Sequence, residues 1–146
     1  MAQTIRWQSD GVKIVRAAAL AEAMAGTSGM ARATAFDFAG SGGGPTWIGV
    51  VTLPPGATTG AHHHGRHEVA VYVVRGRGTI RWGDRLEFAA DVGVGDFVYF
   101  APQVPHQEQN LAADAPLDFV VVRSDNERIA VALDIPPDAE PARTAG

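Results

Sequence analysis

The chain has 146 residues, a length typical of one domain with a single hydrophobic core. Its 46% hydrophobic and 19% charged residues indicate a globular chain, and its net charge of −4 gives no reason to expect nucleic acid or an anionic membrane as a partner. The absence of cysteine excludes disulfides, thiolate metal ligands and a thiol nucleophile. Because no apolar run suggests a signal peptide or a membrane span, a cytoplasmic location is the expectation.

The N-terminal and C-terminal ends are predicted to be additions to a central domain. Residues 1–29 form an N-terminal extension, in which residues 12–15 favour a short strand. Residues 16–25 are the one run of strong helix formers, and Gly26 suits the end of a helix. The fold is therefore expected to contain at most one short helix. The Pro/Ala-rich tail, residues 135–146, is expected to be peripheral or partly disordered.

Residues 30–134 read as a succession of short strands separated by glycine and proline. The expected strands, in chain order, are 30–38, 46–53, 69–75, 79–82, 85–89, 97–100, 117–123 and 129–133. Residues 40–45 read as a flexible loop, and Gly83-Asp84 is a hairpin signal. This spacing is typical of an all-β fold, an antiparallel sandwich or barrel in one domain.

The histidines are distributed unevenly, since four of the five lie within residues 62–67 and the fifth is His106. Side chains alternate between the two faces of a strand, so His62 and His64 should face the same way and His63 the opposite way. Imidazoles that converge on one point suit zinc, iron, copper, nickel or manganese. We therefore predict one divalent metal ion per chain, with a coordination position left open for water or substrate. The alternative is a surface cluster of histidines in a loop.

The residues around these histidines resemble the two sequence motifs of the cupin superfamily. The first motif is matched by Gly56, His62, His64, Glu68 and Gly76. The second is matched by Gly95, His106 and Asn110, while Ala101 and Gln103 stand where the motif has Pro and Gly. The resemblance implies a single-domain double-stranded β-helix, or jelly-roll barrel, over residues 30–134, with one metal ion in its mouth. It also implies a small-molecule substrate and, by analogy, a homodimer.

The first motif departs from the family pattern at its third ligand. Seven residues rather than six separate Glu68 from Gly76, so the third-ligand place falls on Val69, which cannot bind metal. Strand alternation then favours His67, two residues earlier on the same face. The predicted ligand set is all imidazole: His62, His64, His67 and His106. Glu68 is the competing third ligand, or it could orient an imidazole by accepting its free N–H.

Glu108 is a further candidate, because it follows His106 by two residues and so shares its strand face. It could be a fourth ligand, as resemblance to the pirin branch of the cupins implies, or a general base beside the metal. Glu108 and Glu68 are thus the two candidate catalytic carboxylates. The alternative for Glu108 is a solvated side chain at the rim of the barrel.

Strand positions indicate structural roles for two larger groups of side chains. The arginines expected to be outward charges are Arg66, Arg75, Arg77, Arg81 and Arg85. The aromatic residues expected in the core or lining a pocket are Trp47, Trp82, Phe97, Tyr99, Phe100 and Phe119.

The favoured function is a metalloenzyme in which the ion polarises a carbonyl or enolate oxygen, or binds O₂. The chain is similar to small cupins that act as polyketide aromatase/cyclases or as dioxygenases, whose substrates chelate a metal through oxygen. Cyclisation, isomerisation and oxygenation all remain open. The alternative is a non-catalytic metal- or ligand-binding sensor module. A metal-free sugar-binding or isomerase-type cupin is disfavoured by the five histidines.

Overall fold

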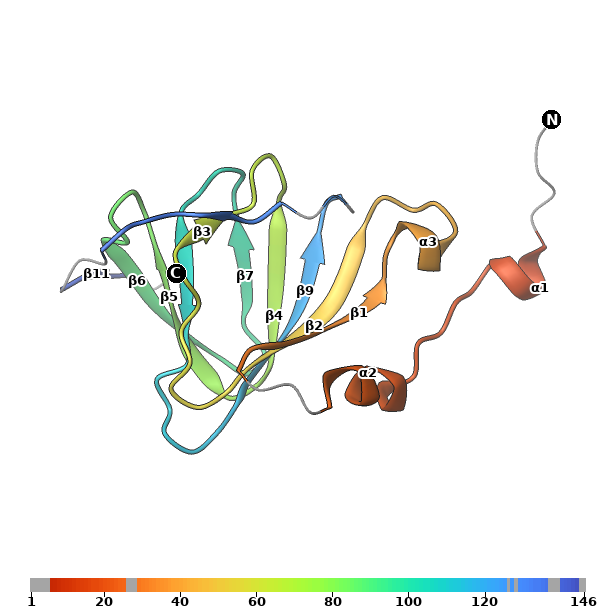
Figure 1. Cartoon of the computed structure of the whole chain (residues 1–146), viewed down its shortest axis with the longest axis horizontal. Coiled ribbons are helices and arrows are strands. Elements are labelled where there is room, and N and C mark those ends of the chain that lie inside the picture. The colour runs from red at the N-terminus through yellow and green to blue at the C-terminus, as the bar shows by residue number, and fades with distance from the viewer. Residues whose placement is uncertain (1–5, 26–28, 126, 128, 137–139, 145–146) are drawn as a thin grey trace.

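The computed structural model describes residues 6–25, 29–125, 127, 129–136 and 140–144. Two β-sheets lie face to face and enclose the core (Figure 1). The first sheet has five strands in the order β1-β2-β9-β4-β7, and the second has six in the order β10-β3-β8-β5-β6-β11. Neighbouring strands are antiparallel except for β6 and β11, which pair in parallel. The predicted all-β jelly-roll barrel is therefore confirmed.

The strands are short, as the spacing of glycine and proline predicts. Their bounds are β1 Ala31–Phe36, β2 Trp47–Leu53, β3 His62–His63, β4 Val69–Arg75, β5 Arg77–Trp82, β6 Phe88–Gly93, β7 Phe97–Phe100, β8 His106–Gln109, β9 Leu117–Arg123, β10 Val131–Ala132 and β11 Ala142–Arg143.

The core forms because alternate side chains of the first sheet point toward the second sheet. Burial alternates along β2 and along the first five residues of β4, and the inward positions of β4 are Val69, Val71 and Val73. Leu117 and Phe119 of β9 add to the same cluster, which Ile80 and Phe100 join from other strands. The inner face of the first sheet thus forms an apolar wall along one side of the barrel.

The helices differ in number from the expectation of at most one. The predicted helix over residues 16–25 is present as α2 (Ala17–Met24), and α1 (Trp7–Asp10) and α3 (Phe38–Ser41) are two additional single turns. α3 lies at the start of the predicted loop, because the Asp37 side chain accepts a hydrogen bond from Gly40 N at 2.7 Å and caps the turn. No described helix reaches the length and apolar character that crossing a membrane requires.

At the N-terminal end one prediction is wrong, and at the C-terminal end the structure adds a short edge strand. Residues 12–15 form no strand, and the apolar side chains of Val12 and Ile14 are 75% and 64% exposed, so no neighbouring strand covers them. In the tail, Ala142 and Arg143 form β11, which pairs with Phe88 and Ala89 of β6. The Arg143 guanidinium also forms an ion pair with Asp91 at 2.7 Å, which helps to hold this strand.

Three side-chain predictions are also wrong. Arg81 is buried rather than outward, and its guanidinium donates two hydrogen bonds to the backbone oxygen of Leu86, at 3.1 and 2.8 Å. Phe97 and Tyr99 are 79% and 61% exposed, because β7 is an edge strand and these two residues lie on its outer face. Strand alternation alone does not say which of the two faces is covered.

Candidate metal centre

Pairing of β3 with β8 brings the two histidine-bearing segments together. His62 lies opposite His106 in the antiparallel register, although the residues are far apart in the sequence. Thr59 N donates to Glu108 O at 2.9 Å, and Asn110 N donates to Ala57 O at 2.9 Å, so the contact extends beyond β3. The segment that precedes the histidines is therefore fixed against β8 over several residues.

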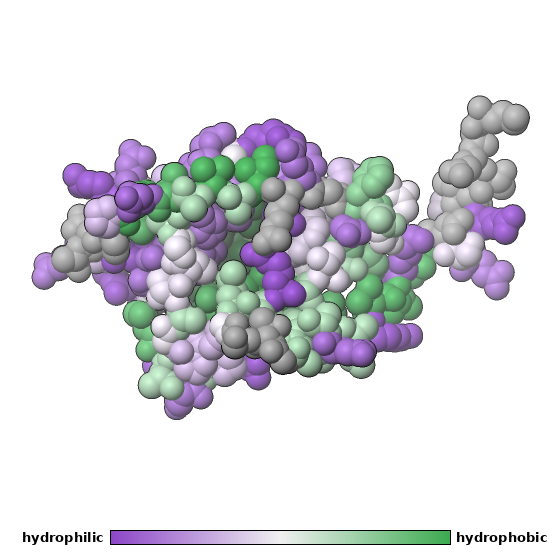
Figure 2. All heavy atoms as spheres, in the orientation of Figure 1, coloured by the Kyte–Doolittle hydropathy of each residue, from purple (hydrophilic) through white to green (hydrophobic). Residues whose placement is uncertain are grey.

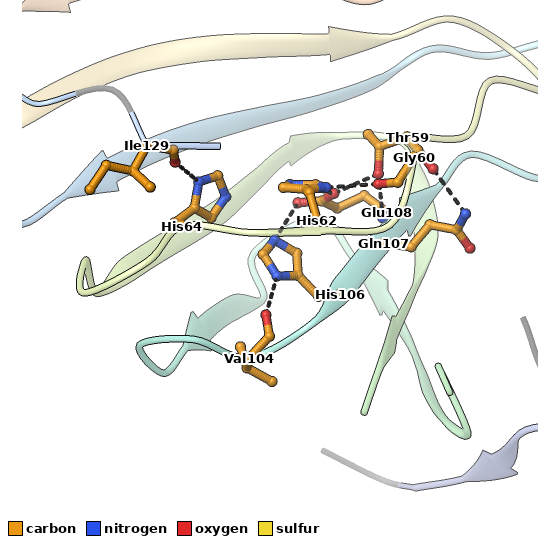
Figure 3. A network of polar contacts seen from close by, with 9 residues as sticks. All are labelled: Thr59, Gly60, His62, His64, Val104, His106, Gln107, Glu108 and Ile129. Carbon is orange, nitrogen blue, oxygen red and sulfur yellow. Dashed lines mark hydrogen bonds and ion pairs between the residues drawn. The ribbon is translucent and has the colours of Figure 1, made fainter. Parts of the chain in front are cut away.

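Three of the four histidines predicted as ligands form one cluster (Figure 3). One nitrogen from each of His62, His64 and His106 lies within 4.8 Å of the others. The ring centroids are 4.9 Å apart for His62 and His64, 4.4 Å for His62 and His106, and 5.1 Å for His64 and His106. Three imidazoles at these separations can converge on a single ion.

Each ring of the cluster is oriented by a backbone carbonyl that contacts its Nδ1 atom (Figure 3). The contacts are His62 with Gly60 O at 2.7 Å, His64 with Ile129 O at 2.9 Å and His106 with Val104 O at 3.0 Å. A carbonyl oxygen can only accept, so Nδ1 carries the hydrogen in all three rings. The Nε2 lone pairs are therefore the ones available to a metal ion, and the carbonyls hold them in place.

The protein environment also favours the neutral form of His64 and His106, as metal binding requires. Burial lowers the pKa of His64 from 6.5 to about 4, and the neighbouring His106 and His62 contribute in the same direction. Burial likewise lowers the pKa of His106, against the opposing effect of Glu108. Within the described residues, His106 Nε2 is buried and has no hydrogen-bond partner. A divalent ion would satisfy this atom, so the donor set fits a metal.

Glu108 adds a carboxylate to the cluster from the same strand as His106. Its Oε1 lies 3.7 Å from His106 Nε2, and its Oε2 lies 4.0 Å from His62 Nε2. The Thr59 hydroxyl donates to Oε2 at 2.9 Å and accepts from Glu108 N at 3.0 Å, which fixes the side chain. The carboxylate is thus placed to complete the coordination of an ion or to exchange a proton with a molecule bound beside it.

The structure does not bring His67 into the cluster. Among the described residues, the histidine nitrogens that lie within 4.8 Å of one another belong to His62, His64 and His106. His67 is buried at 1% exposure, and its backbone N–H donates to His64 O at 3.1 Å, which closes a turn over residues 64–67. Gly65 makes that turn possible with a φ of +58°. The turn interrupts strand alternation, so counting back from β4 does not place His67 beside His64.

Two other residues of the histidine segment lie outside the cluster. Glu68 is exposed, and its Oε1 accepts a hydrogen bond from the Tyr99 hydroxyl at 2.9 Å, on the outer face of the barrel. His63 accepts a hydrogen bond from Gly65 N at 2.9 Å through its Nδ1. The geometry therefore favours Glu108 over Glu68 as the carboxylate of the site.

A cavity of about 600 Å³ opens beside the cluster, within the range of small-molecule sites. His62, His64 and Glu108 line one part of the cavity. Much of the remaining lining consists of apolar side chains of the first sheet. Residues of the C-terminal segment, 129, 130 and 132, also line it. Figure 2 shows a hollow in this face of the molecule with hydrophobic residues along its upper edge.

Arg123, at the end of β9, lines the cavity but is not among the site residues predicted from the sequence. Its side chain is buried, with 6% exposed, and its guanidinium carbon lies 4.1 Å from the centre of the Trp47 ring. The alternation along β9 could have identified it. Leu117 and Phe119 point inward, and Arg123 lies an even number of residues further along, so it shares their face of the strand.

Two facing sheets with a histidine cluster inside the barrel define a double-stranded β-helix protein. The chain belongs to the cupin family: residues 49–123, about half of its length, match the Cupin domain. The residues of the cluster all fall inside this segment. None of the curated proteins matches the chain.

Solved structures support the same fold. An uncharacterized conserved protein with a double-stranded β-helix domain from Klebsiella pneumoniae is 17% identical over 84% of this chain and 99% of its own, with a TM-score of 0.66. A cupin 2 domain-containing protein from Halorhodospira halophila is 29% identical over 79% and 77%, with a TM-score of 0.62. The polyketide cyclase RemF from Streptomyces resistomycificus is 19% identical over 94% and 89%, with a TM-score of 0.64.

Proposed function

We propose that the protein is a metal-dependent enzyme that acts on a small molecule able to chelate a metal through oxygen, such as an enolisable carbonyl or an aromatic, polyketide-like compound. The observation that carries this proposal is the set of three imidazoles, each oriented by a backbone carbonyl, beside a cavity of about 600 Å³. Glu108 lies 3.7 Å from His106 Nε2 and 4.0 Å from His62 Nε2. The similarity in fold to a polyketide cyclase is consistent with it.

The roles of the chain's own residues follow from their positions. His62, His64 and His106 would hold one divalent ion, of zinc, iron, manganese, nickel or copper. When bound, such an ion supplies Lewis acidity at a carbonyl or enolate oxygen, or a site for O₂. Glu108, held by the Thr59 hydroxyl, would take a proton from the carbon next to that carbonyl and return it at the product stage. The apolar walls of the cavity would exclude water from the reacting atoms.

The experiment that tests the proposal combines metal analysis with a search for turnover. Protein purified without added metal is expected to contain close to one divalent ion per chain by elemental analysis. It is then offered β-diketones, catechols and aromatic polyketide-like compounds, and products and O₂ consumption are measured. Cyclised or isomerised product without O₂ consumption indicates a cyclase or isomerase, and O₂ consumption indicates a dioxygenase. Stoichiometric metal with ligand binding but no turnover would identify the non-catalytic sensor alternative.

The Glu108→Gln variant is expected to lower turnover by about 10²- to 10⁴-fold, the usual contribution of a positioned general base. Glutamine keeps the size of the side chain and can still contact the Thr59 hydroxyl, so the metal content should remain close to that of the wild type. Steady-state kinetics and elemental analysis of the same preparations check both statements. Glu68→Gln is the matched comparison, and a larger loss in that variant than in Glu108→Gln would contradict the assignment.

The homodimer expected from the family resemblance stays a prediction. The outer face of β4 and β7 offers a surface for it, because Tyr72 and Phe97 are exposed there with ring centroids 4.7 Å apart. Tyr99 extends the same face at 61% exposure. A second copy that covered these aromatic side chains would remove apolar surface from water.

A further inference from the structure

We infer that the substrate carries a carboxylate at the end remote from the metal, and that Arg123 binds this carboxylate. The inference rests on the proposed function and narrows its substrate class to oxygen-chelating molecules that are also carboxylic acids with a flat, apolar body. It follows from the placement of Arg123 and Trp47 in the cavity that the histidine cluster faces.

Arg123 belongs to a row of inward side chains that crosses the first sheet toward the cluster. Arg123 lies opposite Trp47 of β2 on one side and Val69 of β4 on the other. Val69 lies opposite Phe100 of β7, and the Phe100 ring stacks on His106 with centroids 4.2 Å apart. The row therefore connects the guanidinium to a metal-ligand candidate across one continuous surface of the barrel.

The spacing of strands sets the length of a molecule that spans this row. Phe100 and Arg123 are separated by two strand spacings, which is roughly 10 Å at about 4.8 Å each. This backbone separation exceeds the length of a two-carbon dicarboxylate, so the substrate class inferred here has one or two aromatic rings between its chelating oxygens and its carboxylate. The cavity volume of about 600 Å³ accommodates a body of this size.

The chemistry at this end of the row suits a flat carboxylic acid. A guanidinium presents paired N–H donors that match the two oxygens of a carboxylate, and this pairing is strongest where water is excluded. The indole of Trp47 lies under the guanidinium and fixes its plane. It also adds aromatic surface to the cavity lining. A second arginine, the exposed Arg32 of the edge strand β1, also lines the cavity.

The test compares two ligands of nearly the same shape, one charged and one neutral: biphenyl-4-carboxylate and biphenyl-4-carboxamide. Titration calorimetry with the protein as purified is expected to show at least about tenfold tighter binding of the carboxylate, the effect of a hydrogen-bonded charge. In Arg123→Met the preference should fall to about twofold or less. Arg123→Lys should show an intermediate preference, because the ammonium keeps the charge but lacks the paired donors. Arg77→Met, at an exposed position on β5, is the matched control and should keep the wild-type preference.

Equal binding of the two probes by the wild-type protein, or binding of neither, would overturn the inference without any variant. A wild-type preference that persists in a folded Arg123→Met protein would overturn it as well. If Arg123→Met does not fold, as judged by circular dichroism, Arg123→Lys decides: an unchanged preference is contrary evidence. None of these readouts depends on turnover. Absence of a carboxylate preference in the wild-type protein therefore counts against this inference alone, whereas absence of metal and turnover counts against the proposed function.

Discussion

Replacing His106 with alanine is expected to lower the affinity for a divalent ion by at least about 100-fold. Loss of an outer-shell partner alone typically costs 10- to 100-fold, and His106 would be lost as a direct ligand. The ring lies within 5.1 Å, centroid to centroid, of both other imidazoles, and its Nε2 atom is buried and oriented by the Val104 carbonyl. The remaining two rings cannot hold the ion as tightly. Elemental analysis after dialysis and titration with Zn²⁺ or Co²⁺ measure the change.

The matched control is His63→Ala, which removes an imidazole from the same segment. His63 lies outside the cluster and accepts a hydrogen bond from the Gly65 backbone, so metal affinity should change by less than about threefold. His106→Gln, which keeps more of the buried volume against Phe100, separates loss of the ligand from loss of packing. Equal effects of His63→Ala and His106→Ala would show that the ion is held elsewhere.

Replacing Asn110 with alanine is expected to lower the free energy of unfolding by about 2–4 kcal/mol, a range set by its several buried hydrogen bonds. Its side chain is fully buried at 0% exposure. The amide nitrogen donates to three backbone carbonyls, of Leu53 at 3.0 Å, Pro54 at 3.1 Å and Ala115 at 2.9 Å, and Oδ1 accepts from Ala112 N at 3.1 Å. The substitution leaves these buried groups unsatisfied. Urea unfolding monitored by tryptophan fluorescence measures the loss.

Asp114→Ala is the control from the same connection between β8 and β9. Asp114 is exposed, so its replacement should change the free energy of unfolding by less than about 0.5 kcal/mol. A loss below about 1 kcal/mol for Asn110→Ala would show that water replaces the amide easily and that the loop does not depend on it. The result is also relevant to the candidate metal centre, because Asn110 N donates a hydrogen bond to Ala57 O in the segment that leads to His62.

The fold could be predicted largely from the sequence, because strand length and burial in this chain are set locally. β2, β4 and β9 begin and end at or within one residue of the predicted bounds, since glycine and proline flank alternating or β-branched runs. The weak predictions were those that depend on a partner. Residues 12–15 have strand-forming side chains but no strand beside them, and β11 exists only through its pairing with β6.

The candidate site was predictable in part. His62, His64 and His106 follow from strand alternation and from the motif spacing, and the structure places their nitrogens together. The position of His67 could not be foreseen, because it depends on a turn at Gly65 whose carbonyl accepts from Gln103 N at 2.8 Å, a contact between distant segments. The stacking of Arg123 on Trp47 likewise requires the register between β2 and β9.

The Ile129 carbonyl that orients His64 has a consequence for the order in which the protein matures. This carbonyl and β10, which pairs with His62 and His63, follow β9 in the chain and so are synthesised after it. A nascent chain that ends near β9 would already hold all three imidazoles but could not align the second of them. In the proposed metalloenzyme, binding of the ion should therefore follow docking of residues 129–132 against the histidine segment.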